Sequence, residues 1–310
     1  MRTAFVAELT SLARENPSVI LLTGDLGYTV FEPFQTEFPT RYINCGVAEA
    51  NMIGTAAGLA REGFKPFVYS FIPFAIFRAL EQIRIDICYH ELPVTIVGLG
   101  AGYSYGDMGA THHAVEDIAV ARALPNLTVI CPGDPWEVRH AIRALAAYPG
   151  PAYVRLAKRG EPIIHAAASR AEFHIGRALV IQDGRDIALL ATSNMLATAV
   201  DAARLLESKH GIRPTVVSMH TLKPFDENYI RRLSERCRAI FTVEEHSVLG
   251  GLGGAVCEIV AEAPTGCTVH RIGIPDRFVH VSGSQAFYRE QCGLTSENIV
   301  NSVVGTYATA

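Results

Sequence analysis

The sequence predicts an α/β fold made of two doubly wound domains. Short runs of Val, Ile, Leu and Thr alternate with segments of helical spacing along the 310 residues. Such alternation is typical of parallel strands joined by crossover helices. The alternation stops once, around residues 160–180, and then resumes. We therefore expect a first domain over 1–165, a linker over 166–180 and a smaller domain over 181–310.

Each expected element follows from its local pattern. In the first part, five apolar runs have the length of buried strands, namely 19–23, 66–70, 94–97, 127–131 and 152–156. Residues 41–45 have the aromatic and β-branched character of a short extra strand. Five segments show helical periodicity, namely 3–15, 48–61, 74–89, 116–123 and 134–146. The second part contributes the strand candidates 187–191, 215–218, 239–243 and 267–270.

Composition favours a small-molecule site. The chain is 49% hydrophobic and 19% charged, and its net charge of −4 gives no electrostatic reason to expect nucleic acid or a membrane as partner. No apolar run approaches the roughly 20 residues of a membrane helix. Glu8 comes too early for the core of a signal peptide. We therefore expect a cytoplasmic protein.

Cysteine and histidine spacings do not predict a metal site. The 7 cysteines form no Cys-x-x-Cys pair and lie mostly in apolar runs, as reduced core residues do. The 11 histidines show no His-Glu-x-x-His spacing. We expect no metal ligands in this chain.

Glu49 is the residue that most needs a functional explanation. It follows a short strand and opens a helix of small apolar residues, so the strand-to-helix junction directs it to a crevice. A glutamate there commonly just complements the helix dipole. Phe71, Phe74 and Phe77 follow at intervals of three, and such rings are commonly core residues. Together, an acid and a flat apolar platform suit an aromatic heterocycle.

The chain resembles the pyrimidine-binding and C-terminal portions of transketolases, which are thiamine-diphosphate enzymes. The segments that carry the resemblance are Gly46-Val-Ala-Glu49, the three phenylalanines, Gly109-Ala-Thr-His-His113 with Glu116, Ala123-Leu-Pro-Asn126, Met219-His-Thr-Leu-Lys-Pro224 and Val243-Glu-Glu-His246 with Gly250–Gly253. The resemblance covers nearly the whole chain.

The resemblance implies cofactor roles for six residues. Glu49 would hydrogen-bond N1′ of the aminopyrimidine and favour its imino form, which takes the proton from the thiazolium C2. Phe74 would stack on the pyrimidine, with Phe71 and Phe77 beside it. Asp25 and Leu26 would lie in a turn that approaches the cofactor.

The resemblance also implies substrate contacts. His112 would face the substrate hydroxyls as a catalytic residue, with His113 as a second candidate. Arg2 and Lys158 would bind a substrate phosphate, although lysine lacks the fork of arginine and both residue types are ordinarily solvated at such places.

Two departures from the family pattern concern the donor. Met108 stands where pentose-using transketolases have an aspartate, unless Asp107 reaches across from one position earlier. Gly100 stands where they have a phosphate-binding histidine. A shorter, less phosphorylated or otherwise modified ketose, or a 2-oxo acid, is the donor that these positions suggest.

A third departure predicts a partner. The family holds the diphosphate through Mg²⁺ with a Gly-Asp-Gly motif and a later Asn, whereas this sequence has only Gly24-Asp-Leu-Gly27. We expect a split transketolase, in which a separate N-terminal transketolase subunit supplies the diphosphate and Mg²⁺ site and two copies of each subunit form an α2β2 heterotetramer.

Three alternatives stay open. The first is the β subunit of a 2-oxo-acid dehydrogenase, against which Gly109-Ala-Thr-His112 and Ala123-Leu-Pro-Asn126 count. The second is a fragment of a deoxyxylulose-phosphate synthase, and the third is a non-catalytic assembly subunit. The segment 244–253 resembles a phosphate loop but lacks the Walker lysine and the Rossmann spacing, so we expect it to pack against the partner subunit.

Overall fold

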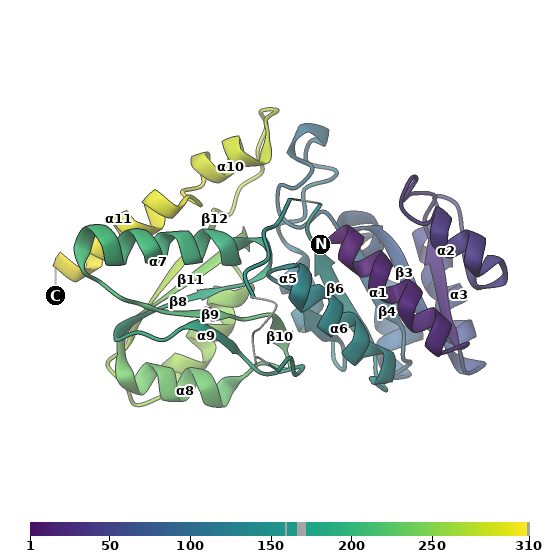
Figure 1. The fold of residues 1–310 in the computed structure, drawn as a ribbon, viewed down its shortest axis with the longest axis horizontal. Coiled ribbons are helices and arrows are strands. Elements are labelled where there is room, and N and C mark those ends of the chain that lie inside the picture. The colour runs from purple at the N-terminus through teal and green to yellow at the C-terminus, as the bar shows by residue number, and fades with distance from the viewer. Residues whose placement is uncertain (159, 166–171, 309–310) are drawn as a thin grey trace.

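The chain folds into two twisted sheets that lie side by side, and helices cover both faces of each sheet (Figure 1). The structure is a computed structural model that describes residues 1–158, 160–165 and 172–308. The α/β fold predicted from the sequence is confirmed. Within those residues, no helix has both the length and the apolar character needed to cross a bilayer.

The first sheet has seven strands in the order β10-β5-β6-β4-β3-β1-β2. They are β1 (Val19–Thr23), β2 (Tyr42–Asn44), β3 (Lys65–Phe71), β4 (Thr95–Leu99), β5 (Thr128–Ile130), β6 (Ala152–Leu156) and β10 (Thr221–Lys223). All pairs are parallel except that of β10 with β5. The central strands are buried on both faces, which explains their continuous apolar runs.

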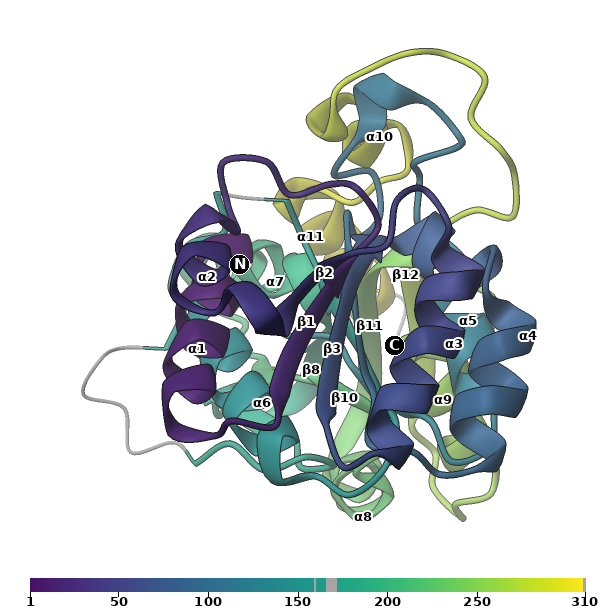
Figure 2. The same cartoon turned by 90° about the vertical axis from the view of Figure 1, so that its right-hand side faces the viewer.

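Helices cover both faces of this sheet. Figure 2 shows α1 (Arg2–Glu15) and α6 (Pro135–Ala147) on one face, and α3 (Glu49–Arg61) and α5 (Asp117–Ala123) on the other. Beside α3 runs a helical segment over 73–89, in which two stretches of wide π turns, Pro73–Phe77 and Ile83–Tyr89, flank the short α4 (Leu80–Gln82). The short α2 (Glu32–Glu37) lies near the edge strand β2.

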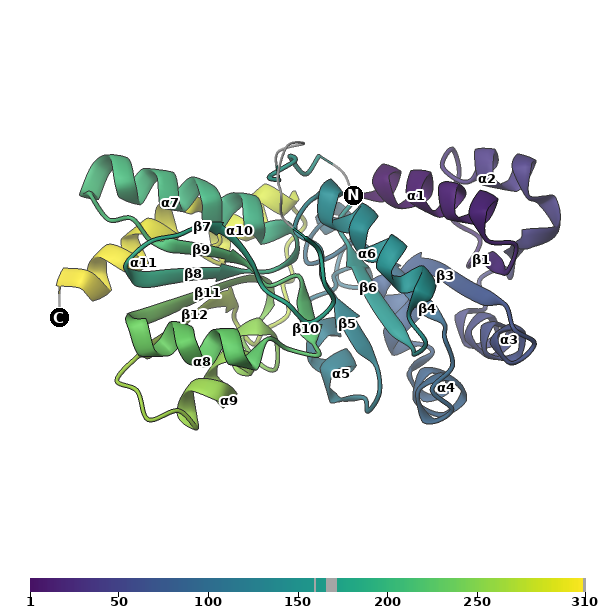
Figure 3. The ribbon, with the colours of Figure 1, turned by 60° about the horizontal axis from the view of Figure 1, so that its bottom comes forward.

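The second sheet has the order β12-β11-β8-β9-β7. Its strands are β7 (Leu179–Gln182), β8 (Asp186–Ala191), β9 (Thr215–Ser218), β11 (Cys237–Ser247) and β12 (Thr268–Ile274). Figure 3 shows α7 (Leu196–His210) and α11 (Ser296–Ala308) on one face, and α8 (Glu227–Arg236) and α9 (Leu252–Ala261) on the other. The short α10 (Gln285–Gln291) extends toward the loop after β4 (Figure 1).

The strands predicted for the first part are all present, with ends within two residues of those expected. Two antiparallel strands, β7 and β10, were not predicted, and β11 is longer than expected. β7 begins at Leu179, inside the expected linker of 166–180, and residues 166–171 of that linker lie outside the described residues.

β10 comes from the second half of the chain but completes the first sheet. Thr221 pairs with Ile130, and the carbonyl of His220 accepts a hydrogen bond of 2.7 Å from the backbone N–H of Cys131. The Lys223 ammonium donates to the carbonyls of Arg122 and Leu124, at the end of α5. A cation there complements the negative end of the helix dipole.

A buried carboxylate, that of Glu245 in β11, joins the two halves. Its oxygens accept hydrogen bonds from the Tyr103 backbone N–H at 2.9 Å, from Asn194 Nδ2 at 2.6 Å, and from Gln285 Nε2 at 3.0 Å. Arg289 forms an ion pair with it at 2.5 Å. One side chain thus ties together the loop after β4, the start of α7 and α10.

A buried ion pair lies directly beneath this contact. Arg155 of β6 donates to Asp117 at 2.9 Å and to the backbone carbonyl of Glu245 at 3.0 Å. Tyr153 Oη also donates to Asp117, at 2.6 Å. Both charges of the pair are fully buried, so removing either partner would leave the other uncompensated.

The two residues that flank Glu245 also form hydrogen bonds within the chain. Glu244 accepts the backbone N–H groups of Leu252 and Gly253, in the first turn of α9. His246 Nε2 accepts the N–H of Ala119 at 3.3 Å. The expectation that this segment packs against a partner is therefore wrong for these three buried side chains. They cap helices and join elements of the chain itself.

Gly102 lies at a close approach of the two halves. Its φ is +60°, and a Cβ there would lie 2.5 Å from Glu245 Cγ and 2.9 Å from the Glu245 backbone oxygen. We expect Gly102→Ala to lower the free energy of unfolding by about 2–4 kcal/mol, measured by urea denaturation. Gly58→Ala is the matched control, since Gly58 lies on the exposed side of α3 with open space around it, and should raise stability by about 0.5–1 kcal/mol. Equal effects would contradict this account of the interface.

His246 makes stability depend on pH. Burial lowers the pKa of His246 to about 4. A histidine with a depressed pKa contributes stability that is present above pH 6.5 and is lost as the pH falls toward 4. Compared with His246→Gln, which keeps an acceptor but does not titrate, the wild-type protein should lose up to about 1.4 kcal/mol per pH unit in this window. Urea denaturation of both proteins at several pH values checks this, and a difference that stays constant with pH would contradict it.

Candidate active site

The candidate site lies where the carboxyl ends of five parallel strands of the first sheet meet. Asp25 follows β1, Glu49 follows β2, Phe71 ends β3, the loop 100–113 follows β4 and Lys158 follows β6. The parallel pairing of these strands brings their ends to one edge. Open α/β sheets bind ligands at such an edge.

Glu49 is the first residue of α3, and its side chain is only 1% exposed. Its Oε1 accepts a hydrogen bond of 3.2 Å from Ser70 Oγ, and its Oε2 accepts one of 2.6 Å from Arg78 Nη1. Gly24 lies beside the hydrogen bond from Ser70, since a Cβ there would be 3.3 Å from Ser70 Oγ and 3.4 Å from Glu49 Oε1. The start of α3 favours a negative charge at this position.

Two of the three predicted aromatic residues form a cluster beside Glu49. Phe71 and Phe74 meet edge to face with ring centroids 5.9 Å apart, and His112 lies 5.1 Å from each. The Arg78 guanidinium lies over the Phe74 ring, 4.6 Å from its centroid, while it also bonds Glu49. Glu49 and the face of Phe74 are therefore close enough for one planar group to touch both.

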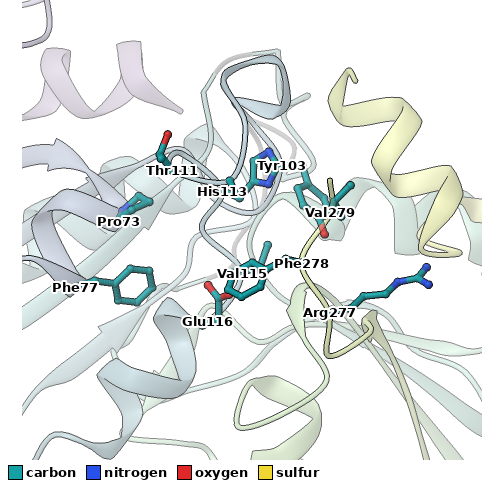
Figure 4. A pocket seen from close by; sticks show the side chains of 11 residues that line it. Pro73, Phe77, Tyr103, Thr111, His113, Val115, Glu116, Arg277, Phe278 and Val279 are labelled. Atoms are coloured by element: carbon teal, nitrogen blue, oxygen red, sulfur yellow. The ribbon is translucent and has the colours of Figure 1, made fainter. Parts of the chain in front are cut away.

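Phe77 does not join this cluster. It is exposed and lines a cavity of about 430 Å³ between the loop 100–113 and the segment 277–279 of the second half. Figure 4 shows Phe77 on one side of this cavity and Val279 on the other. The structure thus brings together two of the three predicted rings.

The two adjacent histidines have different surroundings. His112 is half-buried, and its Nδ1 lies 3.0 Å from Thr111 Oγ1. Burial and the neighbouring His113 lower the pKa of His112. His113 is buried, with its ring edge to face with those of Tyr103 and Tyr288 at 4.9 and 5.2 Å. His113 therefore packs the loop against α10 and does not contact the aromatic cluster.

Asp25 lies in a strained turn after β1. It is exposed with φ of +55°, and it accepts hydrogen bonds from Asn44 Nδ2 at 2.9 Å and Tyr28 Oη at 3.0 Å. These two bonds lower the pKa of the Asp25 carboxyl. Leu26 is half-buried against the core. The turn lies at the same sheet edge as Glu49.

The predicted substrate-binding residues are dispersed around the cluster. The Lys158 ammonium lies over the Tyr105 ring, 4.3 Å from its centroid, and Tyr105 in turn meets Phe71 edge to face at 4.8 Å. Asp107 is exposed on the loop. Arg2 opens α1 and lines a separate cavity of about 440 Å³ with residues such as Thr29 and Pro33. Only Lys158 is connected to the cluster by ring contacts.

Tyr105 also explains the glycine at position 100. Gly100 has φ of +101°, and a Cβ there would lie 2.8 Å from the Tyr105 ring. The ring therefore takes the space into which a larger side chain at position 100 would project. Met108 is 51% exposed on the loop.

Three residues that contact Glu49 or the aromatic cluster were not predicted: Ser70, Arg78 and Tyr105. Arg78 could have been found, because it follows Phe74 by four residues, a spacing at which helical side chains meet. Ser70 directly precedes Phe71, and alternation along β3 turns it to the other side, toward Glu49. Tyr105 gave no such signal.

The residues present fit the pyrimidine half of a thiamine cofactor better than the diphosphate half. A buried acid beside an aromatic face suits a planar nitrogen heterocycle. Across the described ranges, by contrast, no group of three or more His, Cys, Asp or Glu side chains is arranged to hold a metal ion.

Comparison with known proteins identifies the family. Residues 1–161 match the family described as "Transketolase, pyrimidine binding domain", and residues 176–299 match "Transketolase, C-terminal domain". The chain belongs to the transketolase family. It is 40% identical to the putative transketolase C-terminal section of Methanocaldococcus jannaschii, over 98% of this chain and 95% of that protein.

Two further proteins match this transketolase chain over nearly its whole length and nearly their own. One of the subunits of the apulose-4-phosphate transketolase of Phocaeicola vulgatus is 36% identical over 96% of this chain and 94% of its own length. A solved structure described as "Split gene transketolase, inactive beta4 tetramer" superposes with a TM-score of 0.87 at 37% identity, over 98% of this chain and 96% of that one. The chain is thus a C-terminal subunit of the split transketolase type.

The two histidines should respond differently to substitution. We expect His113→Ala to lower the free energy of unfolding by about 2–4 kcal/mol, since it removes a buried ring and its contacts with Tyr103 and Tyr288. His112→Ala should cost less than about 1 kcal/mol, because that ring is half-buried at the edge of the cluster. Urea denaturation measures both, and the reverse order would show that the placement of the two rings is wrong.

Proposed function

We propose that this chain is the pyrimidine-binding subunit of a thiamine-diphosphate-dependent enzyme that transfers a two-carbon ketol unit from a ketose or related donor to an aldehyde. The observation that supports this most directly is the contact of one planar group, the Arg78 guanidinium, with both the Glu49 carboxylate and the Phe74 face. An aminopyrimidine has the size and shape to make the same two contacts. When bound, thiamine diphosphate supplies the electron sink for breaking a carbon–carbon bond beside a ketone.

Each residue of the site has a defined part in this proposal. Glu49 shares a proton with the ring nitrogen N1′ across a short, charge-assisted bond. Ser70 holds the other carboxylate oxygen in place. Phe74, braced by Phe71 and not by Phe77, orients the pyrimidine. Asp25 and Leu26 border the cofactor from the turn after β1.

Substrate contacts come from the surrounding loop and strand ends. His112 is placed against both phenylalanines and faces the donor hydroxyls. Lys158, held over Tyr105, receives an anionic end of the substrate. Asp107 and Arg2 contribute only at the outer end of a bound donor, and His113 supports the loop. The Tyr105 ring lies close to Gly100 and narrows the outer end of the donor site. This favours a donor other than the usual pentose phosphate.

A separate N-terminal transketolase subunit completes the proposed enzyme. Relatives that this chain matches over nearly their whole length are named as a C-terminal section and as one subunit of a transketolase. We infer that the N-terminal subunit holds the diphosphate and Mg²⁺, and that two copies of each form an α2β2 heterotetramer.

Reconstitution tests this function. The chain, its proposed N-terminal partner and their mixture are assayed with thiamine diphosphate, Mg²⁺ and a panel of phosphorylated and unphosphorylated ketoses. Ketol transfer is expected only in the mixture. Glu49→Gln should lower kcat by at least about 100-fold, because proton transfer at N1′ is lost.

Glu62→Gln, at the exposed end of the same helix, is the matched control and should leave kcat unchanged. Activity of the purified chain alone would refute the need for a partner. Full activity of Glu49→Gln in the mixture would refute the role of Glu49 and would favour a non-catalytic subunit.

A further inference from the structure

Arg78 makes both of the contacts that the proposed function gives to the aminopyrimidine. Its Nη1 donates to Glu49 Oε2 at 2.6 Å, and its guanidinium carbon lies over the Phe74 ring, 4.6 Å from the centroid. We call the space between the Glu49 carboxylate and the Phe74 ring the pyrimidine seat. A guanidinium is planar, stacks on aromatic faces and donates hydrogen bonds to carboxylates. A protonated aminopyrimidine shares these three properties.

The position of Arg78 shows that the guanidinium and an aminopyrimidine exclude each other. The Glu49 side chain is 1% exposed, and its two oxygens are engaged by Ser70 and Arg78. A ring that stacks on Phe74 and bonds Glu49 Oε2 needs the space that the Arg78 guanidinium occupies, because that group lies over the same face and bonds the same oxygen. Arg78 therefore has to move before an aminopyrimidine can make both contacts.

Arg78 is the neighbour that is free to move. Its side chain is 45% exposed, whereas Ser70 is fully buried in β3. Long exposed side chains change rotamer within nanoseconds. Within the described residues, the ion pairs of Arg78 involve no carboxylate besides Glu49.

We propose that Arg78 is a built-in competitor of the cofactor, which occupies the pyrimidine seat and has to swing out into solvent when the cofactor binds. This inference rests on the proposed function of the site. The apparent affinity for the cofactor is then weaker than the intrinsic affinity, because only the fraction of molecules in which Arg78 has left the pyrimidine seat can bind. The contact also keeps a charge partner on a buried carboxylate that would otherwise be uncompensated.

Cofactor affinity tests the inference. The Kd of thiamine diphosphate, with excess Mg²⁺, is measured by calorimetry on the reconstituted two-subunit complex carrying wild-type chain, Arg78→Ala, Arg78→Gln or Arg84→Ala. Loss of the competitor should tighten binding about 5–30-fold in Arg78→Ala, which is the combined contribution of one partly exposed ion pair and one cation–π contact. Arg78→Gln keeps a donor for Glu49 but no cation and should tighten binding less. Arg84, exposed on the same helical segment, is the matched control and should have no effect.

Weaker or equal binding by both Arg78 variants would overturn the inference, since a residue that positions Glu49 for the cofactor would give that result. If neither variant folds, chemical modification of the wild-type complex decides. Phenylglyoxal should modify Arg78 faster after the cofactor is added, relative to Arg84, and slower modification would overturn the inference. Absence of cofactor binding by all four complexes would refute the proposed function itself.

Discussion

The arrangement of the molecule depends on one buried carboxylate, that of Glu245. It receives donors from the loop after β4, from the start of α7 and from α10, and its backbone oxygen bonds Arg155 of the first sheet. The loop that it holds carries His112 to the aromatic cluster. Hence the second half of the chain, whose described residues contribute no side chain to that cluster, still determines its geometry. A carboxylate suits this task because it accepts up to four hydrogen bonds from different directions.

Much of the site could be predicted because parallel strands leave little freedom. Once β1, β2, β3, β4 and β6 pair in parallel, the residues that follow them meet at one edge, and Glu49 lies there whatever the details of packing. Periodicity was a poorer guide in the segment 73–77. Its wide π turns change the angle between residues three apart, which separates Phe77 from Phe74.

Other features depend on partners distant in sequence. β10 is a strand of three residues, too short to show alternation, and it pairs antiparallel with β5, about 90 residues earlier. The segment 244–253 resembled a phosphate loop because its acids are followed closely by three glycines. In the structure, the N–H groups of α9 that a phosphate would bind are taken by Glu244. Burial raises the pKa of that carboxyl to about 7.

The crossing of β10 into the first sheet separates the boundary in the sequence from the boundary in space. A fragment that ends in the linker would contain the candidate site but would leave the edge of β5 unpaired, and a free strand edge invites association with other chains. The same holds during synthesis. The first sheet lacks its last strand until residues 221–223 have left the ribosome, so the first half of the chain cannot reach its final form before more than two thirds of the protein has been made.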